Sequence, residues 1–295
     1  MRSKASTFLA LGLPVVLALA YFCLVIKPSA HANPSATRVT AEESARLWDK
    51  CNTLYREAKY QELLPDLHTL LDAHPGSHIY LEMAAQAYGQ LGDHQHEAEY
   101  WEKYFDHAPR PTTACPQIGQ AYQKLGKAKE ALDAFERCLA LDPMNVDSIF
   151  FLAHAVEMAG QTDRAAELYA RGVKLAPEDS DLRIGLARVQ QRQGKLKLAM
   201  QTILPVLNTD PASVDALLVA GLVLRSEGDL AGSKQYLRRG VQLADNYLDF
   251  HIVLAQIAER EKNYGEAIRQ YDRVLQQEPN NQDIRSRRDA LREKQ

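Results

Sequence analysis

The stretch "EALDAFERCLALDP", residues 130–143, has the pattern of an amphipathic helix that ends at a proline. Nearly the same string returns as "RAAELYARGVKLAP" at 164–177 and as "EAIRQYDRVLQQEP" at 266–279. The three strings end at Pro143, Pro177 and Pro279, which are 34 and 102 residues apart. A fixed period of this length is the sequence signature of a repeat architecture, so the recurrence decides the fold.

The same step of 34 residues holds at other positions. Prolines keep it at Pro75, Pro109, Pro143, Pro177, Pro211 and Pro279, with Asp245 in the slot between the last two. Seventeen residues before these slots stand Ala58, Gly92, Gly126, Gly160, Gly194, Gly228 and Lys262. Small residues such as Ala131 precede the slots by twelve, and large apolar ones such as Phe135 by eight. A glycine separates two helices, a small residue lets them approach, a large one fills the space one turn later, and proline ends the pair.

This pattern resembles the tetratricopeptide repeat (TPR), a helix-turn-helix unit of 34 residues. The unit 112–145 carries the resemblance best, with Gly119, Tyr122, Ala131, Phe135 and Pro143 at the expected places. The resemblance implies an all-α protein, a right-handed α-solenoid. We expect seven TPR units over residues 44–281 and a polar capping helix over 282–295. The seven units are 44–77, 78–111, 112–145, 146–179, 180–213, 214–247 and 248–281.

The first 43 residues are of a different kind. A basic tail (1–7) with Arg2 and Lys4 precedes an uncharged apolar run (8–26), and a small, polar, proline-bearing linker (27–43) follows. The run has 19 residues, about the length that an α-helix needs to cross a bilayer. We interpret it as an uncleaved signal anchor, because the apolar region of a cleaved signal peptide is usually shorter. The alternative is a signal peptide cleaved near Ala30 and Ala32.

Either interpretation places the rest of the chain outside the cytoplasm. An anchor predicts a single-pass protein of the inner (cell) membrane whose TPR body lies in the periplasm or another extracytoplasmic space. Cleavage predicts a soluble periplasmic or secreted protein. The formal net charge of -3 and the lack of a basic block interleaved with aromatic residues argue against a nucleic-acid partner.

The resemblance also implies where a partner binds, because certain positions of the first helix in each TPR unit tend to face an inner groove. These positions hold an apolar set and, beside it, a basic set. The apolar set is Trp48, Phe150, Ile184, Leu218 and Ile252, and the basic set is Arg188, Arg192, Arg225 and Arg260, with Glu157 and Glu259 as partial counter-charges. Such a groove suits a peptide or protein with hydrophobic anchors and some acidic residues.

A structural interpretation of the same residues stays open. Arg183 and His251 stand where a buried apolar residue is usual, so Ile184 and Ile252 would then fill the core. The arginines would be solvated surface charges.

No catalytic or cofactor motif is found, and the seven units leave no room for a catalytic domain. We therefore expect no enzyme activity and no cofactor. His94 and His96 are interpreted as surface-turn residues, so no metal site is predicted. Cys115 and Cys138 occupy the start of the first helix and the end of the second in one unit. Since these helices are antiparallel, a disulfide between the two cysteines is a hypothesis.

These observations predict a non-enzymatic protein–protein interaction scaffold, membrane-tethered and extracytoplasmic, that binds a peptide or protein partner in its groove and helps assemble an envelope complex. One alternative is a structural scaffold that self-associates through its convex faces or the ends of the array. Another is a soluble adaptor released by signal cleavage.

Overall fold

The computed structural model describes residues 39–294, and this part of the chain is helical throughout, with fifteen α-helices, one short 3-10 helix and no strand. The predicted all-α solenoid fold is confirmed. The predicted membrane segment 8–26 lies outside the described residues, as does the predicted linker up to residue 38.

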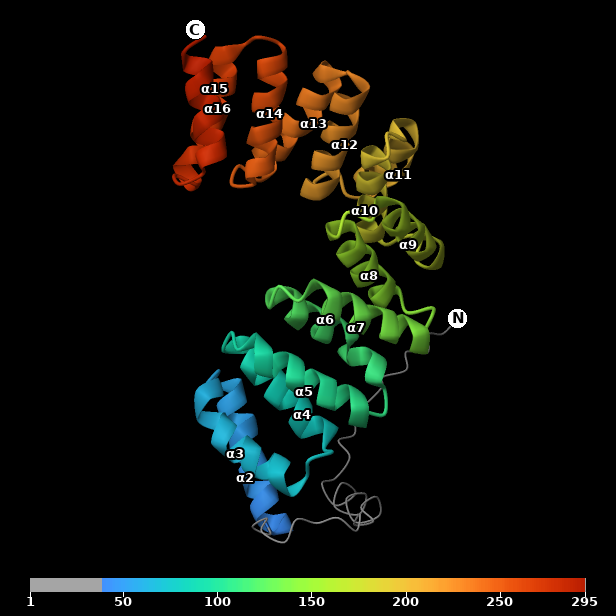
Figure 1. The fold of residues 1–295 in the computed structure, drawn as a ribbon, viewed down its shortest axis with the longest axis vertical. Coiled ribbons are helices and arrows are strands. Elements are labelled where there is room, and N and C mark those ends of the chain that lie inside the picture. The colour runs from blue at the N-terminus through green and yellow to red at the C-terminus, as the bar shows by residue number, and fades with distance from the viewer. Residues whose placement is uncertain (1–38, 295) are drawn as a thin grey trace, which may run out of the picture.

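Fourteen of the α-helices form seven pairs in chain order, and the pairs stack along one long axis with α2 and α16 toward opposite ends (Figure 1). The first helices of the pairs are α2 (Ala41–Arg56), α4 (His78–Gln90), α6 (Cys115–Lys124), α8 (Val146–Met158), α10 (Ser180–Arg192), α12 (Val214–Glu227) and α14 (Leu248–Arg260). The second helices are α3 (Tyr60–Ala73), α5 (His94–His107), α7 (Ala128–Leu141), α9 (Thr162–Leu175), α11 (Leu196–Thr209), α13 (Leu230–Leu243) and α15 (Tyr264–Gln277).

The turn inside each pair uses a residue in the left-handed region. Five of the seven turn residues are glycines, with φ between 71° and 92°. The other two are Ala58 (φ 57°) and Lys262 (φ 58°), which adopt the same backbone although a Cβ makes it unfavourable. The neighbouring helices therefore impose the turn even where the residue does not favour it.

Each pair closes around a large side chain of its second helix. Phe135 of α7 is fully buried, and its ring presses on Gly119 of α6, where a Cβ would lie 2.0 Å from the ring. Full burial of such a ring contributes about 1.5–3 kcal/mol. The repeat of small and large residues seen in the sequence is therefore the packing of one helix against the other.

Glu97 breaks this rule, because a glutamate stands at a small-residue slot of α5. It is only 8% exposed, yet Gly89 on α4 leaves it room, since a Cβ there would lie 2.8 Å from Glu97 Oε1. His94 Nδ1 lies 2.7 Å from its carboxylate and Lys124 Nζ lies 3.5 Å away. The buried carboxylate is accommodated by partners instead of by loose packing.

The third pair begins irregularly. A 3-10 helix, η1 (Pro111–Ala114), comes first, and α6 begins only at Cys115, with Pro116 in its first turn. Proline is tolerated there because its missing N–H has no acceptor in a first turn. At the N-terminal end of the array, α2 begins at Ala41, because the Thr40 side chain accepts a hydrogen bond from the Glu43 N–H at 3.2 Å.

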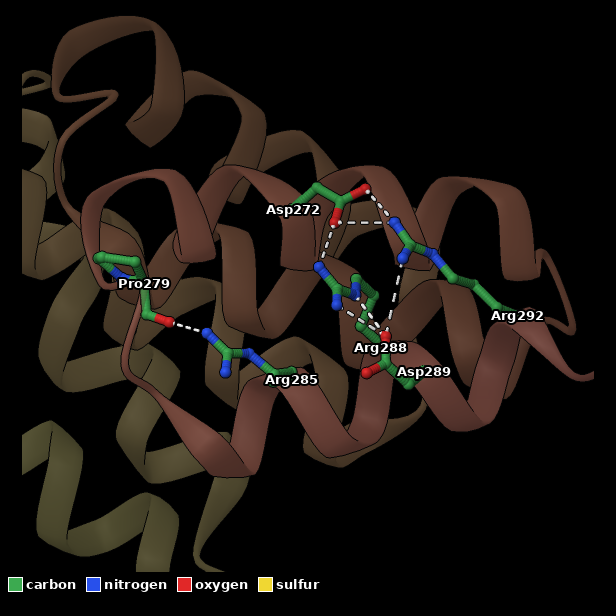
Figure 2. A network of polar contacts seen from close by, with 6 residues as sticks. All are labelled: Asp272, Pro279, Arg285, Arg288, Asp289 and Arg292. Atoms are coloured by element: carbon green, nitrogen blue, oxygen red, sulfur yellow. Dashed lines mark hydrogen bonds and ion pairs between the residues drawn. The ribbon is translucent and has the colours of Figure 1, made fainter.

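The last helix, α16 (Gln282–Arg292), packs on α15 by few apolar side chains, mainly Ile284 and Leu291. Figure 2 shows the polar contacts that supplement them. Arg288 Nη1 lies 3.0 Å from Asp272 Oδ1 on α15, and Arg292 Nη2 lies 3.4 Å from both oxygens of Asp272. Ion pairs thus supplement a small apolar contact at the end of the array.

Candidate partner-binding face

The first helices of successive pairs form a continuous inner layer in the C-terminal part of the array. α6 contacts α8, α8 contacts α10, α10 contacts α12 and α12 contacts α14, whereas no comparable contact joins successive second helices among the described residues. The side of this layer that faces away from the second helices is called the inner face below.

The apolar residues predicted for this face differ in exposure. Phe150, Leu218 and Ile252 are half-buried and pack against the cores of their own units while keeping part of their surface accessible. Phe150 lies with its ring centroid 5.4 Å from that of Phe151 and 6.3 Å from that of Tyr169. In the N-terminal part of the array, Trp48 of α2 is also half-buried and covers Tyr80 of α4 at 5.1 Å between centroids.

Ile184 is different, because it is only 7% exposed and belongs to the core between α10 and α12. The preceding residue, Arg183, is not buried; its Nε donates to the Pro177 carbonyl at 2.7 Å. Ile184 thus fills the core space that Arg183 leaves, as the structural interpretation required. It offers little surface to a partner.

Two of the predicted arginines are engaged within the protein. Glu157 of α8 is 3% exposed and accepts hydrogen bonds from Arg188 Nε at 2.7 Å and Arg188 Nη2 at 2.8 Å. Tyr169 donates its hydroxyl to the same carboxylate at 3.0 Å, and Arg192 Nη1 lies 3.1 Å from it. Burial is the largest single effect and raises the pKa of Glu157, but the hydrogen bonds and charge of Arg188, the Tyr169 hydroxyl and the charge of Arg192 together outweigh it and hold that pKa below its usual range.

The effects on the partners follow from the same geometry. The pKa of Arg188 is raised, chiefly by its bonds to Glu157, so its charge is fixed. Burial and the nearby carboxylate raise the pKa of the Tyr169 hydroxyl. Arg188 therefore joins the fourth pair to the fifth, through a glutamate that the sequence already suggested as a partial counter-charge.

Arg225 lies in the opposite situation. It is half-buried in α12, and the contact it makes is with the Gln256 side-chain oxygen on α14, a neutral acceptor. Burial lowers the pKa of Arg225, since no carboxylate compensates for the lost solvent. Arg260, at the last residue of α14, is exposed.

A row of acidic residues on the first helices was not singled out by the sequence analysis. Each of α8, α10, α12 and α14 has an aspartate as its second residue, and all four are exposed. They are Asp147, Asp181, Asp215 and Asp249. The signal was present in the sequence, since they are 34 residues apart.

Cys115 and Cys138 are joined by a disulfide, with their Cα atoms 6.0 Å apart. It links the start of α6 to the last turn of α7, and both residues are fully buried. Cys51 is a buried free thiol, and burial raises its pKa to about 11.

Within residues 39–294 no cluster of three or more metal-ligating side chains occurs. Over the same range, none of the helices combines the length and the apolar character that a bilayer span requires.

Comparisons with known proteins give the family. Two models described as tetratricopeptide repeat match the chain, one at residues 157–220 and the other at 117–180 and 218–282. No curated protein matches.

Three solved structures have a fold similar to that of this chain. A tetratricopeptide repeat protein from Parabacteroides merdae superposes with a TM-score of 0.70 at 11% identity, covering 85% of this chain and 99% of the other. A thermophilic TPR protein from Thermus thermophilus gives a TM-score of 0.55 at 23% identity, covering 61% and 98%. YrrB, described as a TPR protein with an unusual peptide-binding site, gives 0.51 at 19% identity, covering 62% and 95%.

Proteins built from such repeats use the surface of the stacked helices to bind peptide or protein partners. The matched segments together run from residue 117 to residue 282, and the helix pairs continue N-terminal to them with the same spacing. The described chain therefore belongs to the tetratricopeptide repeat family.

Proposed function

We propose that this protein is a non-enzymatic, membrane-tethered scaffold that binds a peptide or protein partner on its inner face outside the cytoplasm and helps assemble an envelope complex. The observation that carries the binding role is Arg225, a half-buried cation without a carboxylate, on the same helix as the half-buried Leu218 and in contact with α14, which carries the half-buried Ile252. A buried charge is costly unless it is paired, so a partner that supplies a carboxylate there would gain binding energy.

The proposed location is supported by two independent features. One is the apolar run of 19 residues after Arg2 and Lys4. The other is the disulfide between Cys115 and Cys138, a type of bond that persists mainly in oxidising compartments.

Crosslinking in cells tests the binding role. A photo-crosslinking amino acid at Leu218 is expected to capture one defined partner, identified by mass spectrometry, whereas the same probe at Arg239 on the outer helix α13 is not. Equal capture at both positions, or none at Leu218, would argue against an inner binding face.

The location is tested separately. A reporter enzyme that is active only outside the cytoplasm is expected to work when fused after Gln295. A silent reporter with normal expression would contradict the proposed location. A mature chain that begins near Asn33 would replace the anchor by a cleaved signal and make the protein a soluble adaptor.

A further inference from the structure

The inner face carries an acidic rim that its helices do not need for capping. At α8, α10 and α12 the N-cap hydrogen bond is made by the residue before the helix, namely Asn145, Asp179 and Ser213. The aspartate in the second position of these helices therefore has no capping role. Asp215 accepts from the Tyr247 hydroxyl at 3.0 Å, and among the described residues no hydrogen bond or ion pair involves the side chain of Asp147 or Asp181.

The opposite rim carries arginines together with Glu259, whose carboxylate accepts a hydrogen bond from the Tyr271 hydroxyl. The last turns of α10, α12 and α14 carry Arg192, Arg225 and Arg260. Arg192 is already paired with Glu157, which leaves Arg225 and Arg260 to meet external acids. Since the first helices run in the same direction, like charges collect on the same rim along the array.

The distance between the rims selects the form of the partner. An aspartate at the second residue and an arginine at the twelfth or thirteenth are about 15 Å apart along the helix axis. A helix with its side chains is about 10–12 Å wide, so long side chains on its two flanks reach both rims. An extended strand has only two rows of side chains, on opposite faces, so a strand that lays one row on the apolar middle directs the other row away from both rims. A helix therefore fits this width better than a strand does.

The middle of the face supplies apolar contact. Leu218 and Leu222 lie one turn apart on α12, and Ile252 lies on α14; all three are half-buried. Neighbouring helix axes are about 8–10 Å apart, so α10, α12 and α14 together span about 20 Å, the length of a helix of about 14 residues.

We infer that the inner face of α10, α12 and α14 binds an amphipathic helix of a partner protein that has an acidic flank and a basic flank. Its apolar stripe lies on Leu218, Leu222 and Ile252. The acidic flank pairs with Arg225 and Arg260, and the basic flank lies along Asp181, Asp215 and Asp249. This inference rests on the proposed function, since it specifies the partner of the same face.

Selection from a library of random 16-residue peptides displayed on phage, with the full-length chain as bait, tests the inference. The enriched peptides are expected to place apolar residues at i, i+3 or i+4, and i+7, with Asp or Glu on one flank and Lys or Arg on the other. An enriched peptide is then synthesised and its affinity measured by fluorescence anisotropy. Arg225→Gln should weaken binding by about tenfold, and Asp215→Asn by about threefold. Both effects should shrink at high salt.

Arg239→Gln is the matched control, because Arg239 lies on α13 and lines a surface hollow of the outer side. It should leave the affinity unchanged. Circular dichroism of Arg225→Gln checks that the variant is folded, which is expected because the change removes a half-buried charge.

The outcomes separate the two proposals. Some selected peptides could require Leu218 but carry charges of one sign only, no charge, or apolar residues at every second position. Such peptides would overturn the two-flanked helix and leave the inner face as a binding site. A selection that yields no peptide sensitive to Leu218→Asp, in a variant that keeps its helix content, would overturn both.

Discussion

Glu157→Gln is the change that most directly tests how the fourth and fifth helix pairs are joined. The carboxylate is 3% exposed, accepts hydrogen bonds from Arg188 and Tyr169, and forms an ion pair with Arg192. Replacement by the neutral amide leaves both guanidinium groups without their counter-charge. Breaking a buried ion pair typically costs about 3–5 kcal/mol. The Arg188 side chain is 32% exposed, and solvent screening therefore reduces the expected loss of unfolding free energy to about 2–3 kcal/mol.

The dependence on pH has a definite sign. The pKa of Glu157 is lowered in the folded protein, so its contribution is fully present above the pKa of an unfolded glutamate, about 4.3, and is lost as the pH falls through the lower folded value. The difference in unfolding free energy between wild type and Glu157→Gln should therefore be largest near neutral pH and shrink in acid. Loss of the anion should also free Arg188 and Arg192, so acidic peptides should bind the variant more tightly.

Urea unfolding followed by far-ultraviolet circular dichroism, with hydrogen exchange of the α8–α10 amides, measures the effect locally. Glu136→Gln is the control, since Glu136 forms an exposed pair with Arg164 and should change stability by less than about 0.5 kcal/mol. A loss at Glu157 no larger than that of the control, or a difference that grows in acid, would refute the reasoning.

Four other changes test separate parts of the array. Gly160 has φ 76° and no atom near an added Cβ, so Gly160→Ala should destabilise the protein by about 1 kcal/mol through backbone strain alone. Lys262 has φ 58°, so Lys262→Gly should stabilise it by up to about 1 kcal/mol. Urea midpoints that shift in the opposite directions would contradict this. Cys138→Ala should lower the unfolding free energy by about 3 kcal/mol and abolish its sensitivity to reductant, and a reductant-sensitive variant would disprove the assignment. Asp272→Asn should speed hydrogen exchange in α16 at low salt but much less at high salt, whereas an equal effect at both would point to packing instead of charge.

The sequence predicts what is repeated within one helix pair. The turn residues, the buried ring of Phe135 and the place of Cys115 opposite Cys138 all depend on contacts inside a single 34-residue unit, and the register of the repeat aligns them. Their physical causes are local, so the 34-residue spacing of the sequence predicts these features.

Contacts between pairs are less accessible to sequence reasoning. Arg188 and Ile184 occupy positions that the register assigns to the inner face, yet one is bound to Glu157, 31 residues earlier, and the other is core. Each outcome depends on one particular neighbour, Glu157 for Arg188 and Arg183 for Ile184, so the register alone left both interpretations open. Within one pair, the space that Gly89 leaves for Glu97 is likewise a compensation by a single neighbour.

The left-handed turns at Ala58 and Lys262 have a consequence for how such a protein changes over evolutionary time. Because the flanking helices hold the backbone in place, a lineage can replace a turn glycine at a cost of about 1–2 kcal/mol and still inherit the same helix pair. The turn glycine can then be lost by mutation while the helix pair keeps its backbone structure. Ancestry in this protein is therefore preserved longer in the path of the backbone than in the identity of the residues along it.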